Sequence, residues 1–462
     1  MNIVLIVIDT LRADHLSCYG YFRNTSPTID RLAREGVLFE DFYASGAPTG
    51  PGFTSIITGR YPTTHKYYIT PYDIPNAYQL DDNIPVIAEV MWDNGFVTAA
   101  VDNLINFRSH MKHFVRGYEY YMNPTKTSRW VHHHLIADQV NRMAIPWIRR
   151  HSYEKFFLFI HYWDPHMPYN QPEGYRKVFR HHKGDLSDLK VLKAPAGYEY
   201  VPGWGKIDEI VDGDENKSID LYDGEILYVD NAIAEIVETL KDEGILDNTL
   251  LMITSDHGEQ LGQHGVWGHA GLHEPVIKVP LIMRYPKKLP QGLRVKGYAQ
   301  HADIMPTILD YATIPYGEEL DGKSLRKLIE GDRIRDFAIC ETWGERCIIK
   351  DEWKLIVHYE AELKVLHEVF PKPYKLREYA LKWPLEILLK KVVIEDKFGY
   401  ELYNLKEDPM ETINLAEDNK DILKELKEEL DRWISKYVKP SQDPMLHLGK
   451  YTQPQPMEYQ AI

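Results

Sequence analysis

The sequence has few cysteines, no excess of basic residues and no long apolar run. Three cysteines in 462 residues, Cys18, Cys340 and Cys347, are too few for a disulfide framework and form no CxxC metal motif. The 54 Lys and Arg face 69 Asp and Glu, a net charge of −15, which argues against a protein that binds nucleic-acid polymers. No stretch reaches the roughly 18 apolar residues of a transmembrane segment. With 44% hydrophobic and 27% charged residues, the composition is typical of a soluble globular protein.

The first ten residues, MNIVLIVIDT, lack the features of a signal peptide. No basic region precedes the apolar run, and no small-residue cleavage site follows it. The run is typical of a buried strand instead, and we expect a cytoplasmic location for the protein.

Short apolar runs alternate with helical patterns along the first 335 residues. Five or six consecutive apolar residues are typical of a strand that is buried on both faces. Such runs are Ile3–Ile8, Val97–Val101, Phe156–Ile160, Thr249–Thr254 and Val279–Met283. Strands that alternate with helices imply right-handed crossovers. The pattern therefore predicts an α/β fold, with a mostly parallel sheet sandwiched by helices.

The pattern of apolar and charged residues changes near residue 335. We expect an α/β catalytic domain over 1–335, with an insertion at about 170–222 that is rich in Tyr, Gly, Pro and charge. Over 336–440, short runs between charged turns predict a small antiparallel sheet, followed by a helix at Asn419–Tyr437. An insertion at about 360–398 interrupts this part, and 441–462 is expected to be a tail. Within that insertion, Leu376–Ile394 predicts a helical hairpin, with a lid or lipid-facing surface as the alternative.

Acidic and imidazole side chains follow several of the strands, at the edge where α/β sheets bind ligands. Asp9 follows the first run, and Asp256 and His257 follow the fourth. A carboxylate and an imidazole side by side suit Mn, Zn or Fe, whereas Ca would need a shell dominated by carboxylates. Three protein ligands also leave open positions for a substrate. The sequence therefore predicts a divalent metal ion at Asp9, Asp256 and His257, with a helix N-cap as the alternative role of Asp9.

A segment rich in Gly, Pro and Thr, APTGPGFTSIITGRYP, spans residues 47–62. It predicts a loop that enters a short helix near Pro51, with Thr49 beside the helix N-terminus, where free N–H groups favour an anionic ester. A metal that contacts Thr49 would lower the pKa of its hydroxyl and make it a nucleophile at neutral pH. The spacing leaves two alternatives open: Thr49 as an N-cap only, and Thr54 or Ser55 as the nucleophile.

Several motifs, in this order, resemble the sulfatase branch of the alkaline phosphatase superfamily. They are IDTLRADHLSCYGY, NTSPTIDRLAREGVLFEDFYA, the TxP…TGRYPTTH stretch, HYWDPHMPY and TSDHGEQLGQHGVWGHAGLHEPVIKVPLI. WKLIVHY and ELYNLKEDPMETINLAED are similar to that branch's closing domain. The resemblance implies an alkaline-phosphatase-like fold with a small C-terminal antiparallel sheet. It also implies a metal-dependent enzyme that hydrolyses a small anionic ester.

The resemblance departs from the sulfatase pattern at the nucleophile. Sulfatases carry Cys or Ser followed by x-Pro-x-Arg, and convert the first residue to formylglycine, whereas this chain has Thr49 and Phe53 at those two positions. Oxidation of threonine at Cβ would give a ketone, because that carbon bears a methyl group. Thr-x-Pro is similar to nucleotide pyrophosphatase/phosphodiesterase relatives, in which a metal-bound threonine attacks phosphorus. The resemblance thus implies a hydrolase of phosphoric esters with a phospho-threonine intermediate, phosphodiesters or phosphonate monoesters being favoured.

Four further positions bear on substrate and metal binding. His166 in DPH and His269 in WGH match family positions that contact the sulfuryl or phosphoryl group, which implies that they donate to its oxygens or protonate the leaving group. Asn103 falls in the stretch where many sulfatases have Gly-Lys-x-His, and its amide can donate a hydrogen bond to the substrate. Thr10 replaces a second carboxylate that the family often has, which removes one metal ligand.

A second metal ion is an alternative to a single one. Phosphodiesterase relatives hold it with an Asp and two His, and Asp164, His166 and either His269 or His273 would supply such a set. A pair of metals suits phosphoryl transfer. Asp164 has a competing role, because it can cap the turn before Pro165.

Other functions stay open at this point. They are hydrolysis of sulfate esters without formylglycine, transfer of the phosphoryl-bearing group to an acceptor other than water, and a catalytically silent scaffold. The joint presence of Asp9, Thr49, Asp256 and His257 favours an enzyme over a scaffold. The sequence also leaves a homo-oligomer open.

Overall fold

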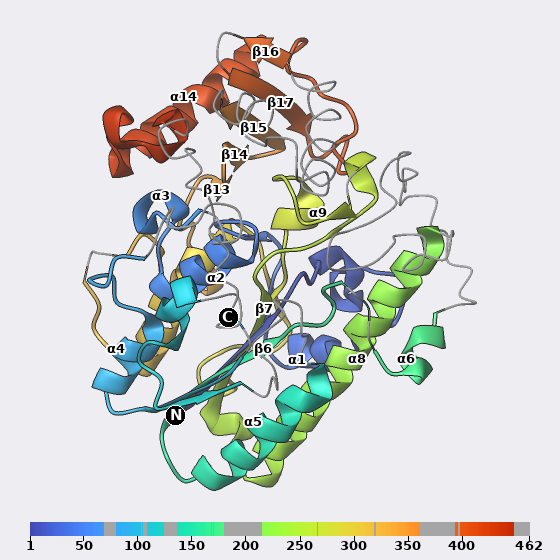
Figure 1. Cartoon of the computed structure of the whole chain (residues 1–462), viewed down its shortest axis with the longest axis vertical. Coiled ribbons are helices and arrows are strands. Elements are labelled where there is room, and N and C mark those ends of the chain that lie inside the picture. The colour runs from blue at the N-terminus through green and yellow to red at the C-terminus, as the bar shows by residue number, and fades with distance from the viewer. Residues whose placement is uncertain are drawn as a thin grey trace, which may run out of the picture.

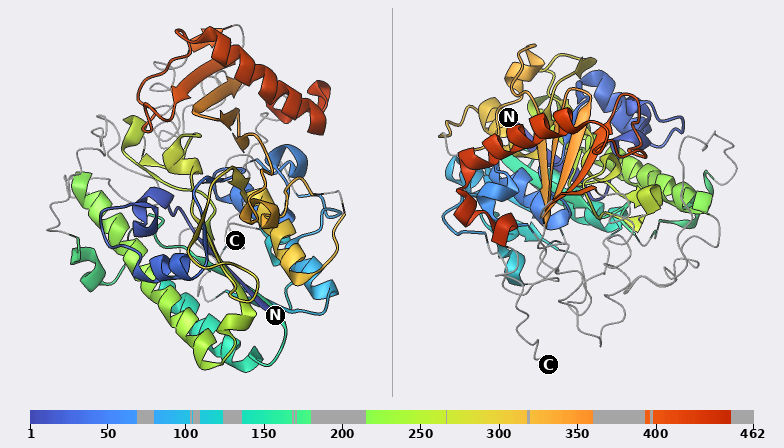
Figure 2. Two further views of the ribbon diagram at one scale, coloured as in Figure 1. Left: turned by 180° about the vertical axis from the view of Figure 1, so that it is seen from behind. Right: turned by 90° about the horizontal axis from the view of Figure 1, so that it is seen from above.

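An eight-stranded sheet forms the centre of the larger part of the molecule (Figures 1 and 2). In this computed structural model the described residues are 1–68, 80–102, 104, 109–123, 136–167, 169, 171–179, 215–265, 267–317, 320–359, 393–395 and 398–447. The strand order is β11-β2-β10-β7-β1-β6-β4-β5. The bounds are β1 (Asn2–Ile8), β2 (Val37–Phe39), β4 (Val97–Val101), β5 (Tyr120–Met122), β6 (Phe156–Tyr162), β7 (Thr249–Ser255), β10 (Leu281–Arg284) and β11 (Leu293–Val295).

Strand β1 lies between β6 and β7 and is parallel to both. Ile8 is opposite Tyr162 of β6 and Ser255 of β7, so the residues that follow these strands reach the same edge of the sheet. The exception is β10, which is antiparallel to both β7 and β2. The prediction of an α/β fold with a mostly parallel sheet is confirmed.

Helices cover both faces of this sheet, as Figure 1 shows. Successive strand residues point to opposite faces, and in β1 Leu5 and Ile6 accordingly enter two different apolar cores. The core around Leu5 includes α2 (Thr49–Thr58), α4 (Ile87–Asp93) and α10 (Ile304–Ala312). The core around Ile6 includes α1 (Pro27–Glu35), α5 (Ala137–His151) and α8 (Glu215–Asp242). Shorter elements are α3 (Pro62–His65), α6 (Glu173–Lys177), α9 (Glu274–Ile277), α11 (Arg326–Ile329), β3 (Phe42–Tyr43), β8 (Gln260–Leu261), β9 (Trp267–Gly268) and β12 (Ala299–Gln300).

A second, antiparallel sheet follows in the chain, in the order β13-β14-β15-β17-β16. Its strands are β13 (Ala338–Thr342), β14 (Glu345–Lys350), β15 (Trp353–Tyr359), β16 (Val393–Glu395) and β17 (Phe398–Asn404), and α14 (Lys420–Tyr437) packs against it through Leu430 and Trp433. This confirms the predicted C-terminal sheet and helix. Strand β13 also bonds to the segment before α2: Glu341 N–H donates to Ser45 O at 3.1 Å, and Ala47 N–H donates to Glu341 O at 3.1 Å.

The predicted insertion at 170–222 is partly helical. It contains α6 and the start of α8, whose Ile219 and Tyr222 are buried in the core around Ile6. The many polar residues of this stretch make its apolar helix face hard to recognise in the sequence. Residues 180–214 and 360–392, and with them most of the predicted hairpin at Leu376–Ile394, lie outside the described residues. Among the described helices, none combines the length and the apolarity needed to cross a membrane.

The predicted tail at 441–462 begins with a buried ion pair. Asp443 accepts two hydrogen bonds from Arg346, at 2.7 and 2.8 Å, and both side chains are almost fully buried. Arg346 thus has a second carboxylate partner besides Glu341, whose Oε1 lies 2.7 Å from the Arg346 Nε.

We expect Asp443→Ala to lower the free energy of unfolding by about 3 kcal/mol, because it leaves part of a buried guanidinium without its partner. Urea denaturation of the two proteins measures this difference. The matched control is Asp431→Ala, which breaks the Lys427–Asp431 pair at 2.6 Å on the surface of α14 and should cost about 0.5 kcal/mol or less. Equal losses of unfolding free energy in both variants would show that the buried Arg346–Asp443 pair stabilises the protein no more than a surface pair.

Candidate active site

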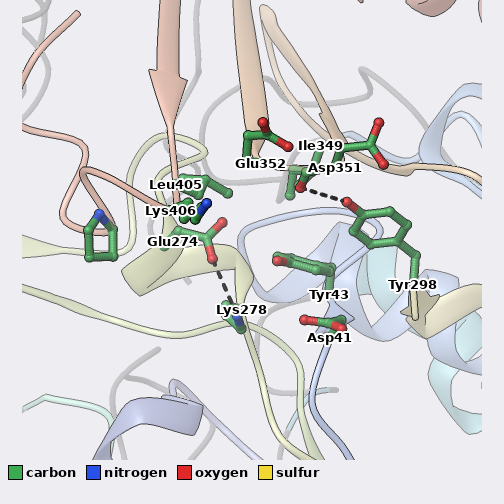
Figure 3. A pocket seen from close by; sticks show the side chains of 11 residues that line it. Asp41, Tyr43, Glu274, Lys278, Tyr298, Ile349, Asp351, Glu352, Leu405 and Lys406 are labelled. Carbon is green, nitrogen blue, oxygen red and sulfur yellow. Dashed lines mark hydrogen bonds and ion pairs between the residues drawn. The ribbon is translucent and has the colours of Figure 1, made fainter. Parts of the chain in front are cut away.

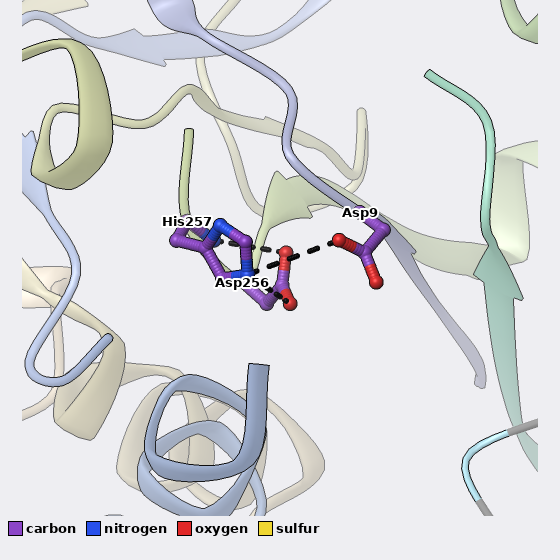
Figure 4. A group of neighbouring side chains, drawn as sticks. All are labelled: Asp9, Asp256 and His257. Carbon is purple, nitrogen blue, oxygen red and sulfur yellow. Dashed lines mark hydrogen bonds and ion pairs between the residues drawn. The ribbon is translucent and has the colours of Figure 1, made fainter. Parts of the chain in front are cut away.

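Three side chains meet at the carboxyl edge of the main sheet (Figure 4). Asp9 follows β1, and Asp256 and His257 follow β7. Each is fully buried and offers a ligand atom within 4.8 Å of the others. Within the described part of the chain, both carboxylate oxygens of Asp9 and Oδ2 of Asp256 have no hydrogen-bond partner. Since buried carboxylates are costly without a cation, this donor set fits the predicted divalent metal ion.

The electrostatics of the two carboxyl groups agree with a cation at this place. Burial raises the pKa of Asp9 above its usual range. Burial also raises the pKa of Asp256, and the nearby Asp9 carboxylate adds to this rise. Two ionised groups so close together inside the protein repel each other, and a divalent ion between them would remove that repulsion.

The backbone around Thr10 sets the position of Asp256. Thr10 has a φ of 55°, an uncommon conformation for a β-branched residue, and Tyr222 holds it by donating its hydroxyl to Thr10 O at 2.7 Å. In this conformation Thr10 N–H donates to Asp256 Oδ1 at 3.2 Å, and His257 N–H donates to the same oxygen at 2.9 Å. Thr10 thus orients a carboxylate through its backbone, at a position where the resembled family often has a carboxylate of its own.

His257 presents its Nε2 atom to the site. Its Nδ1 donates to Gly258 O at 2.8 Å, and burial lowers the pKa of the ring well below the usual range. Nε2 therefore carries a lone pair, and it lies 3.1 Å from Thr49 Oγ1 and 3.3 Å from Asp256 Oδ2. This is the form in which histidine binds a metal.

Thr49 is the first residue of α2, and its side chain reaches His257 from the N-terminus of that helix. The helix lies very close to the residue that follows β7: a Cβ atom added at Gly52 would stand only 2.5 Å from Asp256 O. Only glycine permits this approach. The helix ends at Gly59, whose φ is 67°, as is common for helix C-termini.

The two competing hydroxyl groups are bonded elsewhere. Thr54 donates to Gly50 O at 2.7 Å and lies 3.2 Å from His113 Nε2. Ser55 Oγ lies 3.0 Å from His65 Nε2. Of the three candidate nucleophiles, Thr49 is the one in contact with the metal-site cluster.

His166 and His269 lie beside His257 in a row of imidazole rings. The ring centroids of His257 and His269 are 4.7 Å apart, and those of His269 and His166 are 5.1 Å apart. His269 is partly exposed, and its Nδ1 lies 3.5 Å from Glu259 Oε2. Although burial opposes it, the Glu259 carboxylate raises the pKa of His269. Glu259 was missed in the sequence, although it follows Asp256 and His257 by only a few residues.

Among the remaining predicted residues, Asp164 and His273 have partners outside the metal-site cluster. Asn103 lies outside the described residues. Asp164 hydrogen-bonds to Glu225, and burial raises its pKa to about 7. His273 Nε2 contacts Glu401 Oε2 at 3.2 Å. The structure therefore does not assemble the second metal set that would use Asp164.

A separate cavity of about 400 Å³ lies between α9 and the C-terminal sheet (Figure 3). Tyr43, Glu274 and Tyr298 are among the residues that line it. None of the lining residues belongs to the metal-site cluster or to the row of imidazole rings. This cavity is therefore distinct from the candidate active site.

Residues 1–314 match the family model Sulfatase, and residues 262–379 match the model N-sulphoglucosamine sulphohydrolase, C-terminal. The chain belongs to the sulfatase family. This family is a branch of the alkaline phosphatase superfamily. Divalent metals are typical of the family, in agreement with the cluster of Asp9, Asp256 and His257.

Relatives of this sulfatase-family protein act on different esters. Iduronate 2-sulfatase of Mus musculus is 28% identical over 335 residues, which cover 62% of this chain and 59% of the relative; the chain thus spans about three fifths of that protein. The multifunctional alkaline phosphatase superfamily protein PehA of Trinickia caryophylli is 22% identical, over 90% of this chain and 91% of the relative. The phosphonate monoester hydrolase of Agrobacterium radiobacter has a similar fold, with a TM-score of 0.73, 21% identity, and 95% and 96% of the two chains covered. This similarity confirms the predicted fold.

Proposed function

We propose that the protein is a metal-dependent hydrolase of phosphoric esters, with Thr49 as the nucleophile and phosphodiesters or phosphonate monoesters as preferred substrates. The observation that carries the proposal is the contact of Thr49 Oγ1 with His257 Nε2 at 3.1 Å, beside the buried carboxylates of Asp9 and Asp256, three of whose oxygens have no hydrogen-bond partner among the described residues. A hydroxyl in this place, at a helix N-terminus, is suited to attack an anionic ester.

Asp9, Asp256, His257 and Thr49 would hold the ion, and Mn²⁺ or Zn²⁺ suit this set of donors better than Ca²⁺. When bound, such an ion polarises the ester and lowers the pKa of the Thr49 hydroxyl. The chain itself supplies the orientation, because α2 fixes Thr49 and the backbone at Thr10 fixes Asp256.

The reaction then has two displacement steps. Thr49 loses its proton to water, Oγ1 bonds to phosphorus, and the bond from phosphorus to the leaving oxygen breaks. His269, paired with Glu259, gives the leaving alcohol its proton. In the second step the oxygen of a water molecule bonds to phosphorus, and that water gives a proton to His269. The bond between phosphorus and Thr49 Oγ1 then breaks, and Oγ1 regains a proton from water. His166 would donate to a non-bridging oxygen in both steps.

Phosphorus is favoured over sulfur by the side chains at the formylglycine position. Thr49 cannot form an aldehyde, and Phe53 occupies the place of the motif's arginine, where its ring packs against Phe114 and Phe159. Phosphonate monoester hydrolases are among the proteins of similar fold. Because sulfatases are also among the relatives, hydrolysis of sulfate esters without formylglycine is the second candidate function.

A comparison of substrates tests the proposal. We expect kcat/KM for aryl phosphodiesters or phosphonate monoesters to exceed that for aryl sulfates by about 10³, equivalent to about 4 kcal/mol of transition-state binding. The metal-free protein would be reloaded with Mn²⁺, Zn²⁺ or Ca²⁺, and assayed on both classes and on phosphomonoesters. A preference for sulfate would refute the proposal in favour of the second candidate. No turnover of any ester would favour a transferase or a silent scaffold.

A further inference from the structure

A buried chain of polar side chains lies behind Asp9, on the side away from Asp256. His161, at the end of β6, is the neighbour of Val7 in the sheet. Its Nδ1 contacts Asp102 Oδ1 at 2.7 Å, and its Nε2 lies 3.5 Å from Asp9 Oδ2. Tyr121 hydrogen-bonds to the other oxygen of Asp102. His161, Asp102 and Asp9 are each at most 1% exposed.

We propose that His161, held by Asp102, is a positioning residue that fixes Asp9 for the metal ion. The inference rests on the metal site of the proposed function, and not on Thr49 or on the substrate. In the sequence the two residues are separated by 59 positions, and no motif joins them. The order of the strands, β1-β6-β4, brings them together at the sheet edge.

The two oxygens of Asp9 face different partners. Oδ2 faces His161, whereas Oδ1 lies 3.8 Å from His257 Nε2. A ring that attracts Oδ2 therefore leaves Oδ1 for an ion shared with Asp256 and His257. His161 itself is not part of the group whose ligand atoms lie within 4.8 Å of one another. It thus stands behind a metal ligand, and not among the ligands.

The surroundings of His161 leave its ring little freedom. The Phe53 ring packs against it in a T-shaped arrangement with ring centroids 4.8 Å apart, and the ring centroid of Trp163 lies 6.1 Å away. With apolar rings beside it and carboxylates at both nitrogens, the imidazole is held in one plane. Partners that orient a metal ligand in this way matter for affinity, and their loss commonly costs about 10- to 100-fold in metal binding.

Mn²⁺ binding to the full chain tests the proposal without any substrate. We expect His161→Gln and Asp102→Asn each to weaken Mn²⁺ binding by about 10- to 100-fold, as measured from free Mn²⁺ by electron paramagnetic resonance. Because the two residues act in series, the double variant should bind about as weakly as either single variant. The matched control is His113→Gln, another buried histidine, which contacts Thr54 and no carboxylate at its Nε2. Its affinity should match that of the wild type.

The nitrogen couplings of bound Mn²⁺ separate positioning from direct ligation. One ¹⁴N coupling, from His257, is expected in the wild type and in both variants. A second coupling that disappears in His161→Gln would make His161 a ligand and overturn the proposal, as would unchanged affinity in both variants. Thermal unfolding of the metal-free variants shows whether they are folded, and Asp102→Asn keeps the side-chain volume if His161→Gln is not. A failure of the Thr49 chemistry would leave these results unaffected, so the two failures can be told apart.

Discussion

Thr49→Ala is expected to lower kcat by about 10⁴-fold or more, because it removes the only protein atom that forms a covalent bond to the substrate in the proposed reaction. Metal content and melting temperature should change little, since Asp9, Asp256 and His257 remain in place. Steady-state kinetics with an aryl phosphodiester, together with metal analysis of the same sample, checks both expectations.

Two variants serve as controls for this result. Thr54→Ala removes a hydroxyl from the same buried helix, but that hydroxyl donates to Gly50 O, so kcat should stay close to that of the wild type. Thr49→Ser keeps the nucleophilic oxygen and should retain measurable turnover, with the intermediate trapped on serine. If Thr49→Ala were as active as the wild type, the nucleophile would have to be another group.

Asp256→Asn is expected to remove the metal ion. Oδ1 of Asp256 accepts the N–H groups of Thr10 and His257, whereas Oδ2 has no hydrogen-bond partner among the described residues. Asparagine can keep the first oxygen in place, so its NH₂ group replaces the second, which is the one free to bind an ion. We expect metal affinity to fall by more than about 100-fold, because the loss of partners behind a ligand already costs about 10- to 100-fold.

The stability of the metal-free protein gives a second readout for Asp256→Asn. The substitution removes one of two buried carboxyl groups that repel each other, so the melting temperature without metal should not fall. The matched control is Asp351→Asn, a carboxylate that lines the separate cavity near α9, and it should retain full metal content. Wild-type metal content in Asp256→Asn would refute the assignment of the site.

The sequence predicts that Asp9, Asp256 and His257 gather at one edge of the sheet, and this clustering is confirmed because it depends on local rules. Asp9 and Asp256 each follow a continuous apolar run, and the ends of neighbouring parallel strands share an edge. Gly and Pro around a helix start point to the segment that holds Thr49, but the spacing leaves Thr54 and Ser55 as alternatives, and only the family resemblance favours Thr49. None of these inferences needs to know which strand lies beside which.

Features that depend on strand order or on long-range pairing were not predicted. The apolar run of β10 does not reveal that this strand is antiparallel to β7, since burial on both faces looks the same in either direction. The pairing of His161 with Asp102 requires β6 to lie between β1 and β4. Likewise, Asp443 looks like an ordinary polar residue of a tail until Arg346 is found buried opposite it.

The bonds between β13 and the residues before α2 have a consequence for the order of events in folding. Glu341 bonds through its backbone to Ser45 and Ala47, and its side chain accepts the N–H of Thr63, 278 positions away, at 2.9 Å. The support of the segment before α2 is therefore a long-range contact, which forms only once the C-terminal sheet exists. A nascent chain that has completed its main sheet would still lack this support. During refolding, enzymatic activity should then return later than the helical circular dichroism signal. The delay would measure how slowly the C-terminal sheet docks against the segment before α2.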